Sequence, residues 1–118
     1  MVKNVNNREV NREYTVQEQT VKLIDLGFKK AEASKRYWQE DTFVINNNYC
    51  IGELMLMLPK VLHNGGKNYH FMMTHDGTNY NIIYNNIDDA WQLFRVDEPE
   101  LIDAIFNMLV MLKENCAI

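Results

Sequence analysis

Three residues have a side-chain type and a setting that could support chemistry: Cys50, His75 and Asp76. Cys50 stands three residues before Glu53 at the start of a short predicted helix, the spacing of a capping box with a thiol in the Ser or Thr position. A helix N-terminus stabilises a thiolate, which would suit a nucleophile or a redox centre. Glu53 opposes this, because a nearby carboxylate disfavours a second negative charge. We favour a structural cap or a small buried residue, with a reactive thiol as the alternative.

His75 and Asp76 lie together at the predicted tip of a hairpin, where they could orient a water or a small ligand. Exposed turn polarity explains the pair equally well. His70 and His75 are five residues apart on one predicted strand, so their side chains should project from opposite faces. The sequence also has no zinc-type ligand spacing and no nucleophile–base motif. We therefore predict no metal site, no cofactor and no catalytic residues.

Nucleic acid is not an expected partner. The segment NGGK at 64–67 lacks the spacing of a phosphate loop, and the basic stretch KKAEASKRY at 29–37 has no glycine loop beside it. The net charge of -4 is too small to imply a polyion partner. Residues 76–118 nevertheless carry 8 acidic and 2 basic side chains. Carboxylates in the first turn of a helix stabilise it through the helix dipole, which explains part of this acidic excess. The other hypothesis is that the acidic residues form a binding face.

Three helices should position these residues. The first is predicted to begin at Thr15, which forms a capping box with Glu18, and to end at Gly27. Its apolar face should comprise Val16, Thr20, Leu23, Ile24 and Phe28. A short helix over 51–58 should stop at Pro59. The longest helix is predicted over 98–114, with Asp97 as N-cap and Pro99 in the first turn. Its core stripe should comprise Leu101, Ile105, Met108, Leu109 and Leu112, widened by Ile102 and Ala104.

A hairpin over 68–84 is the clearest β signal. Asp76-Gly77 suits the two central positions of a type I′ turn, where both residues need positive φ. This turn predicts a register that pairs Met73 with Tyr80, Phe71 with Ile82 and Tyr69 with Tyr84. Those residues form an apolar and aromatic face, and the opposite face is mostly polar. A third strand is predicted over 90–96, extended segments over 36–40 and 42–46, and a flexible loop over 62–68.

Length and composition indicate one globular domain. The 118 residues are 47% hydrophobic and 24% charged, which is ordinary for a soluble domain with its own core. We predict a mobile N-terminal tail over 1–13, rich in Asn, Arg and Glu, and a single domain over 14–118. The two cysteines suggest neither a disulfide nor a metal site. No secretory signal or membrane span is visible, so a cytoplasmic location is expected.

Three segments together resemble a group of small uncharacterised proteins encoded by phages and mobile elements of gut bacteria. They are YTVQEQTVKLIDLGF near the start, IGELMLMLPK in the middle and ELIDAIFNMLVMLKEN at the end. The resemblance spans about residues 14 to 115 and implies a first helix, a short helix, a β-meander and a closing amphipathic helix. The group has no established activity, so the resemblance implies no site residues.

Together these patterns predict an α+β domain. We expect an antiparallel sheet of three or four strands in a meander, two main helices packed on one face of it, and one short helix. The expected function is that of a non-catalytic protein-interaction or accessory factor with an unknown protein partner. The alternative is a small-molecule-binding or thiol-based redox protein that uses Cys50. Homo-oligomerisation through a free sheet edge or a Met-rich helix face is compatible with either.

Overall fold

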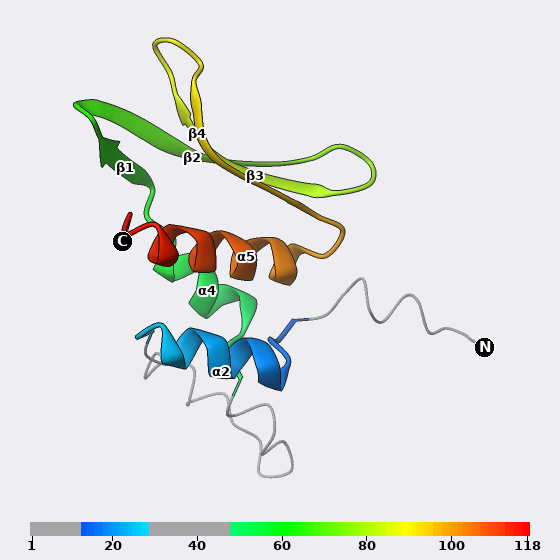
Figure 1. The fold of residues 1–118 in the computed structure, drawn as a ribbon. Helices are drawn as coiled ribbons and strands as arrows, with labels where there is room; N and C mark the ends of the chain where they lie inside the picture. The colour runs from blue at the N-terminus through cyan, green and yellow to red at the C-terminus, as the bar shows by residue number, and fades with distance from the viewer. Residues whose placement is uncertain (1–12, 29–47) are drawn as a thin grey trace.

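The computed structural model describes residues 13–28 and 48–118 and has the predicted α+β architecture. In chain order the described elements are α2 (Gln17–Asp25), α4 (Ile51–Met57), β1 (Val61–Asn64), β2 (Lys67–His75), β3 (Tyr80–Asn86), β4 (Gln92–Glu98) and α5 (Leu101–Glu114). The four strands form one antiparallel sheet in the order β1-β2-β3-β4, which is a meander (Figure 1). The predicted tail over 1–13, except for Glu13, lies outside the described residues, and so do the basic stretch over 29–37 and the predicted extended segments over 36–40 and 42–46.

The first hairpin of the sheet occupies the segment that we predicted to be a flexible loop. β1 pairs with β2 through Asn64 and Lys67, which leaves a two-residue turn of Gly65 and Gly66. Both glycines have positive φ, at 60° and 80°. A type I′ turn requires positive φ at both central positions, and glycine adopts it without steric cost. The loop prediction was wrong because Gly-Gly between short strands is itself a hairpin signal.

The turn between β2 and β3 is longer than predicted. His75 pairs with Tyr80, Met73 with Ile82 and Phe71 with Tyr84, so the register differs from the predicted one by two residues. Asp76 is the reason, because its carboxylate accepts the N–H groups of Thr78 and Asn79 and closes a four-residue loop. A two-residue shift preserves the side-chain faces, since the period of a strand is two. The predicted division into an apolar and a polar face therefore survives.

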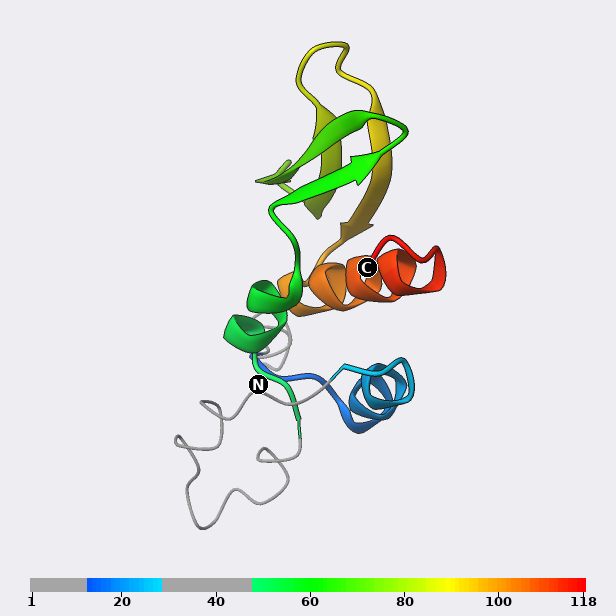
Figure 2. The same cartoon turned by 90° about the vertical axis from the view of Figure 1, so that its left-hand side faces the viewer.

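α5 lies against one face of the sheet and supplies six of the fifteen buried hydrophobic residues in the described core (Figures 1 and 2). Its predicted stripe is confirmed except at Leu101, which is half-buried; the fully buried members are Ile102, Ala104, Ile105, Met108, Leu109 and Leu112. The facing sheet residues Tyr69, Ile82, Tyr84 and Val96 are also buried. The predicted start of the helix was wrong. Asp97 belongs to β4, and the helix begins at Leu101 with Glu100 as N-cap.

α2 lies on the far side of α5 from the sheet, as both views show (Figures 1 and 2). It contacts α5 through hydrogen bonds from Gln19 to Asp103, 2.7 Å, and from Lys22 to Glu114, 3.1 Å. The predicted capping box was wrong, because Gln17 is the first helical residue and Val16 the N-cap. Thr15 instead uses its hydroxyl to accept the N–H of Tyr49, which ties the two described segments together.

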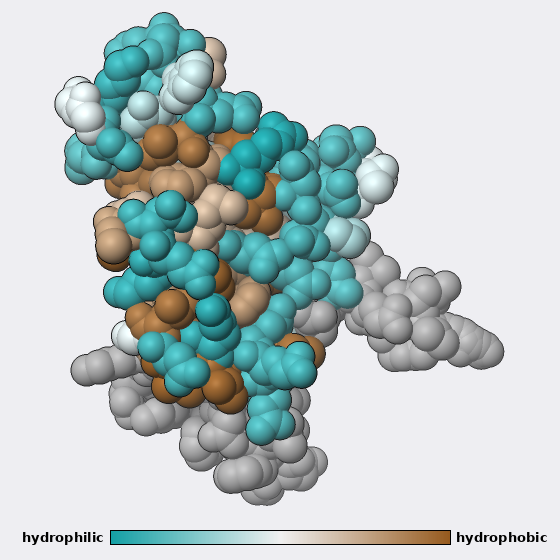
Figure 3. Space-filling view, viewed as in Figure 1, coloured by the Kyte–Doolittle hydropathy of each residue, from teal (hydrophilic) through white to brown (hydrophobic). Residues whose placement is uncertain are grey.

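Part of the predicted apolar face of α2 is exposed. Thr20 and Leu23 are buried, but Val16 and Ile24 are exposed, and so is the neighbouring Val21. Figure 3 shows brown, apolar patches among hydrophilic ones in the region of α2. The end of the helix agrees with prediction, since Gly27 has a φ of 100°. No described helix is long and apolar enough to cross a membrane.

Candidate functional site

Cys50 occupies the predicted capping position at the start of α4. Its backbone N–H donates to Oε1 of Glu53 at 3.1 Å, and Glu53 is buried. Cys50 also forms an isolated antiparallel bridge with Tyr14, and its side chain is half-buried. Through these contacts Cys50 connects the segment before α2 to the first turn of α4, which is a structural role. Cys50 and Cys116 are both free thiols.

His75 and Asp76 are used to shape the turn between β2 and β3. Nδ1 of His75 accepts the N–H of Gly77 at 3.0 Å, and the imidazole packs edge-on against Tyr80 with ring centroids 4.5 Å apart. The hydrogen bonds from the N–H groups of Asn79 and Thr78 hold the pKa of the Asp76 carboxyl below its usual value. The two side chains therefore bond mainly to their own loop. Cys50 belongs to a different element, so the three predicted residues do not form one site.

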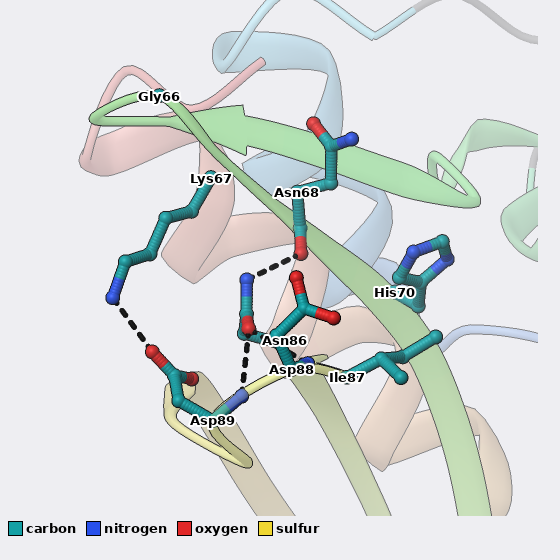
Figure 4. Close-up of a pocket in the computed structure, with 8 residues that line it drawn as sticks. All are labelled: Gly66, Lys67, Asn68, His70, Asn86, Ile87, Asp88 and Asp89. Carbon is teal, nitrogen blue, oxygen red and sulfur yellow. Dashed lines mark hydrogen bonds and ion pairs between the residues drawn. The ribbon is translucent and has the colours of Figure 1, made fainter.

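A concave site lies elsewhere, between the β1–β2 turn and the β3–β4 loop (Figure 4). Its volume is about 330 Å³, and it is open to solvent on one side. The lining residues are Gly66, Lys67, Asn68, His70, Asn86, Ile87, Asp88 and Asp89. None of the three predicted site residues is among them. Neighbouring strands bring the two loops together at one end of the sheet, because the meander pairs β2 with β3.

Asn86 organises the β3–β4 loop. Its buried side chain donates to the carbonyl of Asn68 at 3.0 Å and accepts the N–H groups of Asp88 and Asp89 at 3.0 and 3.1 Å (Figure 4). Its own N–H donates to the carbonyl of Trp91 at 2.8 Å. Asn is suited to this role because its amide both donates and accepts. One residue thus ties the loop to itself and to β2.

An ion pair links Lys67 and Asp89, two of the residues that line the hollow. Nζ of Lys67 lies 2.6 Å from Oδ2 of Asp89, and Oδ1 of Asp89 accepts the N–H of Trp91 at 2.9 Å. The hydrogen bond to Asp89 raises the pKa of Lys67, and the same bond lowers the pKa of Asp89. Both side chains are about half exposed, at 52% and 42%, so the pair contributes little to stability. Its effect is to restrain the loop.

The restrained loop presents two large apolar side chains to solvent. Ile87 is 69% exposed and Trp91 is 64% exposed. Ala90 between them has a φ of 60°, a left-handed conformation that costs an L-residue about 1–2 kcal/mol. Such local strain persists only where surrounding bonds hold it. We define the β3–β4 loop surface as Ile87, Asp88 and Trp91; the loop bonds fix its backbone while leaving its side chains uncovered.

Sequence reasoning included Asp88 in a hypothetical acidic binding face but missed the two apolar residues of this surface, Ile87 and Trp91. We treated residues 85–89 as a connecting loop and placed Trp91 in a strand, whereas β4 begins at Gln92. The available signal was the run NNIDD, whose Asn and Asp side chains favour turns that bond to their own backbone. That signal predicts a turn, and only the pairing of β2 with β3 places it beside Lys67.

The hollow is lined mainly by polar side chains. Lys67 and Asp89 neutralise one another, while Asp88 is exposed and forms no ion pair with any described residue. Within 13–28 and 48–118, no group of three His, Cys, Asp or Glu side chains is placed to hold a metal ion. Comparison of the chain with protein-family models, curated protein sequences and solved structures finds no match.

Proposed function

We propose that this chain is a non-catalytic protein-interaction factor that binds a protein partner through the β3–β4 loop surface. The observation that carries the proposal is the combination of two exposed apolar side chains with a hydrogen-bonded loop backbone. Exposed apolar residues are common singly, but a Trp and an Ile on one restrained loop form a protruding contact. Trp is also among the residues that most often dominate binding energy at interfaces.

The restrained backbone favours tight binding. Association costs free energy whenever a mobile loop must be ordered, and that cost falls when the bound conformation already exists. Asn86 and Asp89 hold the loop through hydrogen bonds to three backbone N–H groups, those of Asp88, Asp89 and Trp91. The loop can therefore present Ile87 and Trp91 without further ordering of its backbone.

The negative charge of Asp88 indicates which charge the partner's surface should carry. Asp88 lies between the two apolar residues in sequence and lines the hollow together with Ile87. A carboxylate there favours a basic side chain on the partner and disfavours an acidic one. We therefore propose a partner that offers an apolar depression flanked by Lys or Arg. A ligand or redox role for Cys50 has less support, since Cys50 caps α4 and does not line the hollow.

The proposal is tested by truncating the loop surface. Proteins captured by the wild-type chain from a cell lysate are identified, and the affinity for the captured partner is measured by calorimetry. Trp91→Ala and Ile87→Ala should each weaken binding by roughly tenfold or more, since hot-spot truncations cost at least 1–2 kcal/mol. Both side chains are exposed, so the fold should be retained.

Leu56→Ala is the matched control. Leu56 is 84% exposed on α4, and its truncation should leave the affinity unchanged. Equal affinities for wild type, Trp91→Ala and Ile87→Ala would place the contact elsewhere. Failure to capture any specific partner, together with turnover in a broad substrate screen, would contradict the non-catalytic function itself.

A further inference from the structure

The outer edge of β4 is unoccupied in the described part of the chain. β4 is the last strand of the sheet, and its only strand partner there is β3 (Figure 2). It runs for seven residues, from Gln92 to Glu98. An uncovered strand edge carries backbone N–H and C=O groups that can pair with another strand. The identity of that strand can be inferred from the residues at the edge.

The registers show which backbone groups face outward. Phe71 donates its N–H to the carbonyl of Lys60 on the β1 side, so the odd-numbered residues of β2 face β1. The backbone N–H and C=O groups of successive residues point to opposite sides of a strand, so the even-numbered residues of β2 face β3. They pair with odd-numbered residues of β3, which leaves the even-numbered residues of β3 facing β4. The hydrogen bond from Asn86 to Trp91 agrees with this. These even-numbered residues of β3 pair with Glu98, Val96 and Phe94 of β4. The backbone groups of Arg95 and Asp97, which lie between them, therefore point toward the free edge.

The side chains of Arg95 and Asp97 lie on the face of the sheet away from α5. Val96 between them is buried, and Glu98 accepts a hydrogen bond from Asn107 of α5, so these two residues face the helix. Arg95 and Asp97 are exposed and form an ion pair of 3.0 Å from Nε to Oδ2. The edge therefore carries one positive and one negative side chain, two residues apart on the same face.

We propose that β4 pairs antiparallel with β4 of a second copy of this chain, so that Arg95 of each copy lies opposite Asp97 of the other. The two-fold axis passes between the two Val96 residues, and the sheets join into one of eight strands. In this register the outward backbone groups of Arg95 and Asp97 meet as hydrogen-bonded pairs. The four side chains alternate in charge, which stabilises cross-strand neighbours.

The two-fold registers centred on Arg95 or on Asp97 are less favourable. An axis at Arg95 places the two guanidinium groups opposite one another, and an axis at Asp97 does the same with the carboxylates; like charges directly opposite are destabilising. Pro99 follows the strand and has no N–H to donate, which limits the length of the pairing. An edge that carried charges of one sign would repel a second copy, whereas this edge is complementary to itself.

Charge reversal tests the register directly. Wild type should sediment as a concentration-dependent dimer in analytical ultracentrifugation. Arg95→Asp gives four negative charges at the junction and Asp97→Arg gives four positive ones, so each variant alone should dimerise roughly tenfold or more weakly. An equimolar mixture of the two variants should form a heterodimer, because every Asp then meets an Arg. The double variant R95D/D97R should recover the homodimer.

Lys22→Glu is the control, since Lys22 is an exposed, ion-paired residue on α2, and it should dimerise like wild type. Trp91→Ala should also dimerise, which separates this inference from the proposed loop contact. A wild type that stays monomeric, single variants that still dimerise, or a mixture that stays monomeric would each overturn the proposal.

Because Asp97 also accepts a hydrogen bond from Asn81, Asp97→Arg can affect folding, and circular dichroism checks this. A second measurement needs no variant. The amide hydrogens of Arg95 and Asp97 should exchange more slowly as the concentration of wild type rises, because dimerisation pairs them. Exchange at these two amides that does not depend on concentration would exclude β4 as the junction.

Discussion

At the scale of single residues, side chains that could bind ligands instead bond to the backbone of their own loop. Asp76 accepts two backbone N–H groups, His75 accepts one, and Asn86 accepts two while donating to Asn68. The same atoms would bind a ligand or a metal if they were not already engaged. The type of a residue therefore limits which ligands its side chain could bind. The hydrogen bonds it makes within its own loop decide whether its polar atoms are available to bind them.

Asp76 provides a test that depends on pH. Its carboxyl pKa is lowered from 3.8, mainly by the N–H groups of Asn79 and Thr78. A lowered folded-state pKa contributes stability above the unfolded-state pKa, and that contribution is lost as the pH falls through the folded value. The free energy of unfolding of wild type, relative to Asp76→Asn, should therefore decrease between neutral pH and pH values below 3.8. Denaturant melts across that range measure the difference.

Asp76→Asn is a suitable reference because its amide oxygen can still accept both N–H groups, so the comparison isolates the charge. A difference between the two proteins that is the same at every pH would show that the charged form gains nothing from these bonds. Direct NMR titration of the Asp76 carboxyl would then be expected to give an unshifted value.

At the scale of elements, the two hairpins are closed by different chemistry. The β1–β2 turn depends on the backbone freedom of Gly65 and Gly66, whereas the β2–β3 turn depends on the carboxylate of Asp76. Both turns contain Gly with positive φ, and the same sequence rule had assigned the two-residue turn to the second hairpin. The two turns differ in their side-chain bonds. The Asp76 carboxylate accepts two backbone N–H groups and so closes a four-residue loop, whereas Gly65 and Gly66 have no side chain that could do this.

Replacing a turn glycine tests this distinction. Gly65 and Gly66 have open space where a Cβ would lie, so Ala there is strained only by its backbone. Gly65→Ala and Gly66→Ala should each lower the free energy of unfolding by about 1–2 kcal/mol, as urea melts would show. Gly52→Ala is the matched control; Gly52 is helical and its Cβ would lie 3.9 Å from Sγ of Cys50. It should be neutral or stabilising by up to about 1 kcal/mol.

If Gly52→Ala and Gly66→Ala destabilised the protein equally, the turn conformation would not be the cause. A milder effect at Gly65 than at Gly66 would instead locate the strain at one of the two turn positions. Both outcomes can be read from the same set of melts.

At the scale of the whole molecule, α5 is the central element. The sheet lies on one side of it and α2 on the other, while α4 packs along it (Figures 1 and 2). Burying its apolar face is therefore a condition for holding the described elements together. The loop surface and the β4 edge depend on this core, because both belong to strands that α5 supports.

Ile105 tests the central role of α5. The residue is fully buried, so Ile105→Asp introduces an unpaired charge into the core and should unfold the protein. Ile105→Val should cost only about 0.5–1.5 kcal/mol. Leu56→Asp, at an exposed position on α4, should melt like wild type. Thermal melts followed by circular dichroism compare the three. An Ile105→Asp protein that melts normally would show that this face of α5 is exposed.

The sequence by itself determined the types of the described elements other than β1, and the two faces of the β2–β3 hairpin. The periods of apolar residues in α5 and in the β2–β3 hairpin are local properties, and so are the left-handed Gly27 and the cap formed by Cys50 and Glu53. Such features depend on neighbours within about five residues. They could be read without knowledge of the fold, and the α+β class follows from them.

Only the tertiary structure decided what these elements bring together. Asn86 contacts Asn68, Lys67 contacts Asp89, and Thr15 contacts Tyr49 across intervals of 18 to 34 residues. No local period encodes such contacts, since they follow from strand register and from the route of the chain between elements. The hollow, the exposed setting of Trp91 and the free edge of β4 all depend on that register. For this reason Cys50, His75 and Asp76, which the sequence marked as candidates for chemistry, form hydrogen bonds that hold the local backbone. The candidate contact surfaces lie elsewhere, on the β3–β4 loop and at the edge of β4.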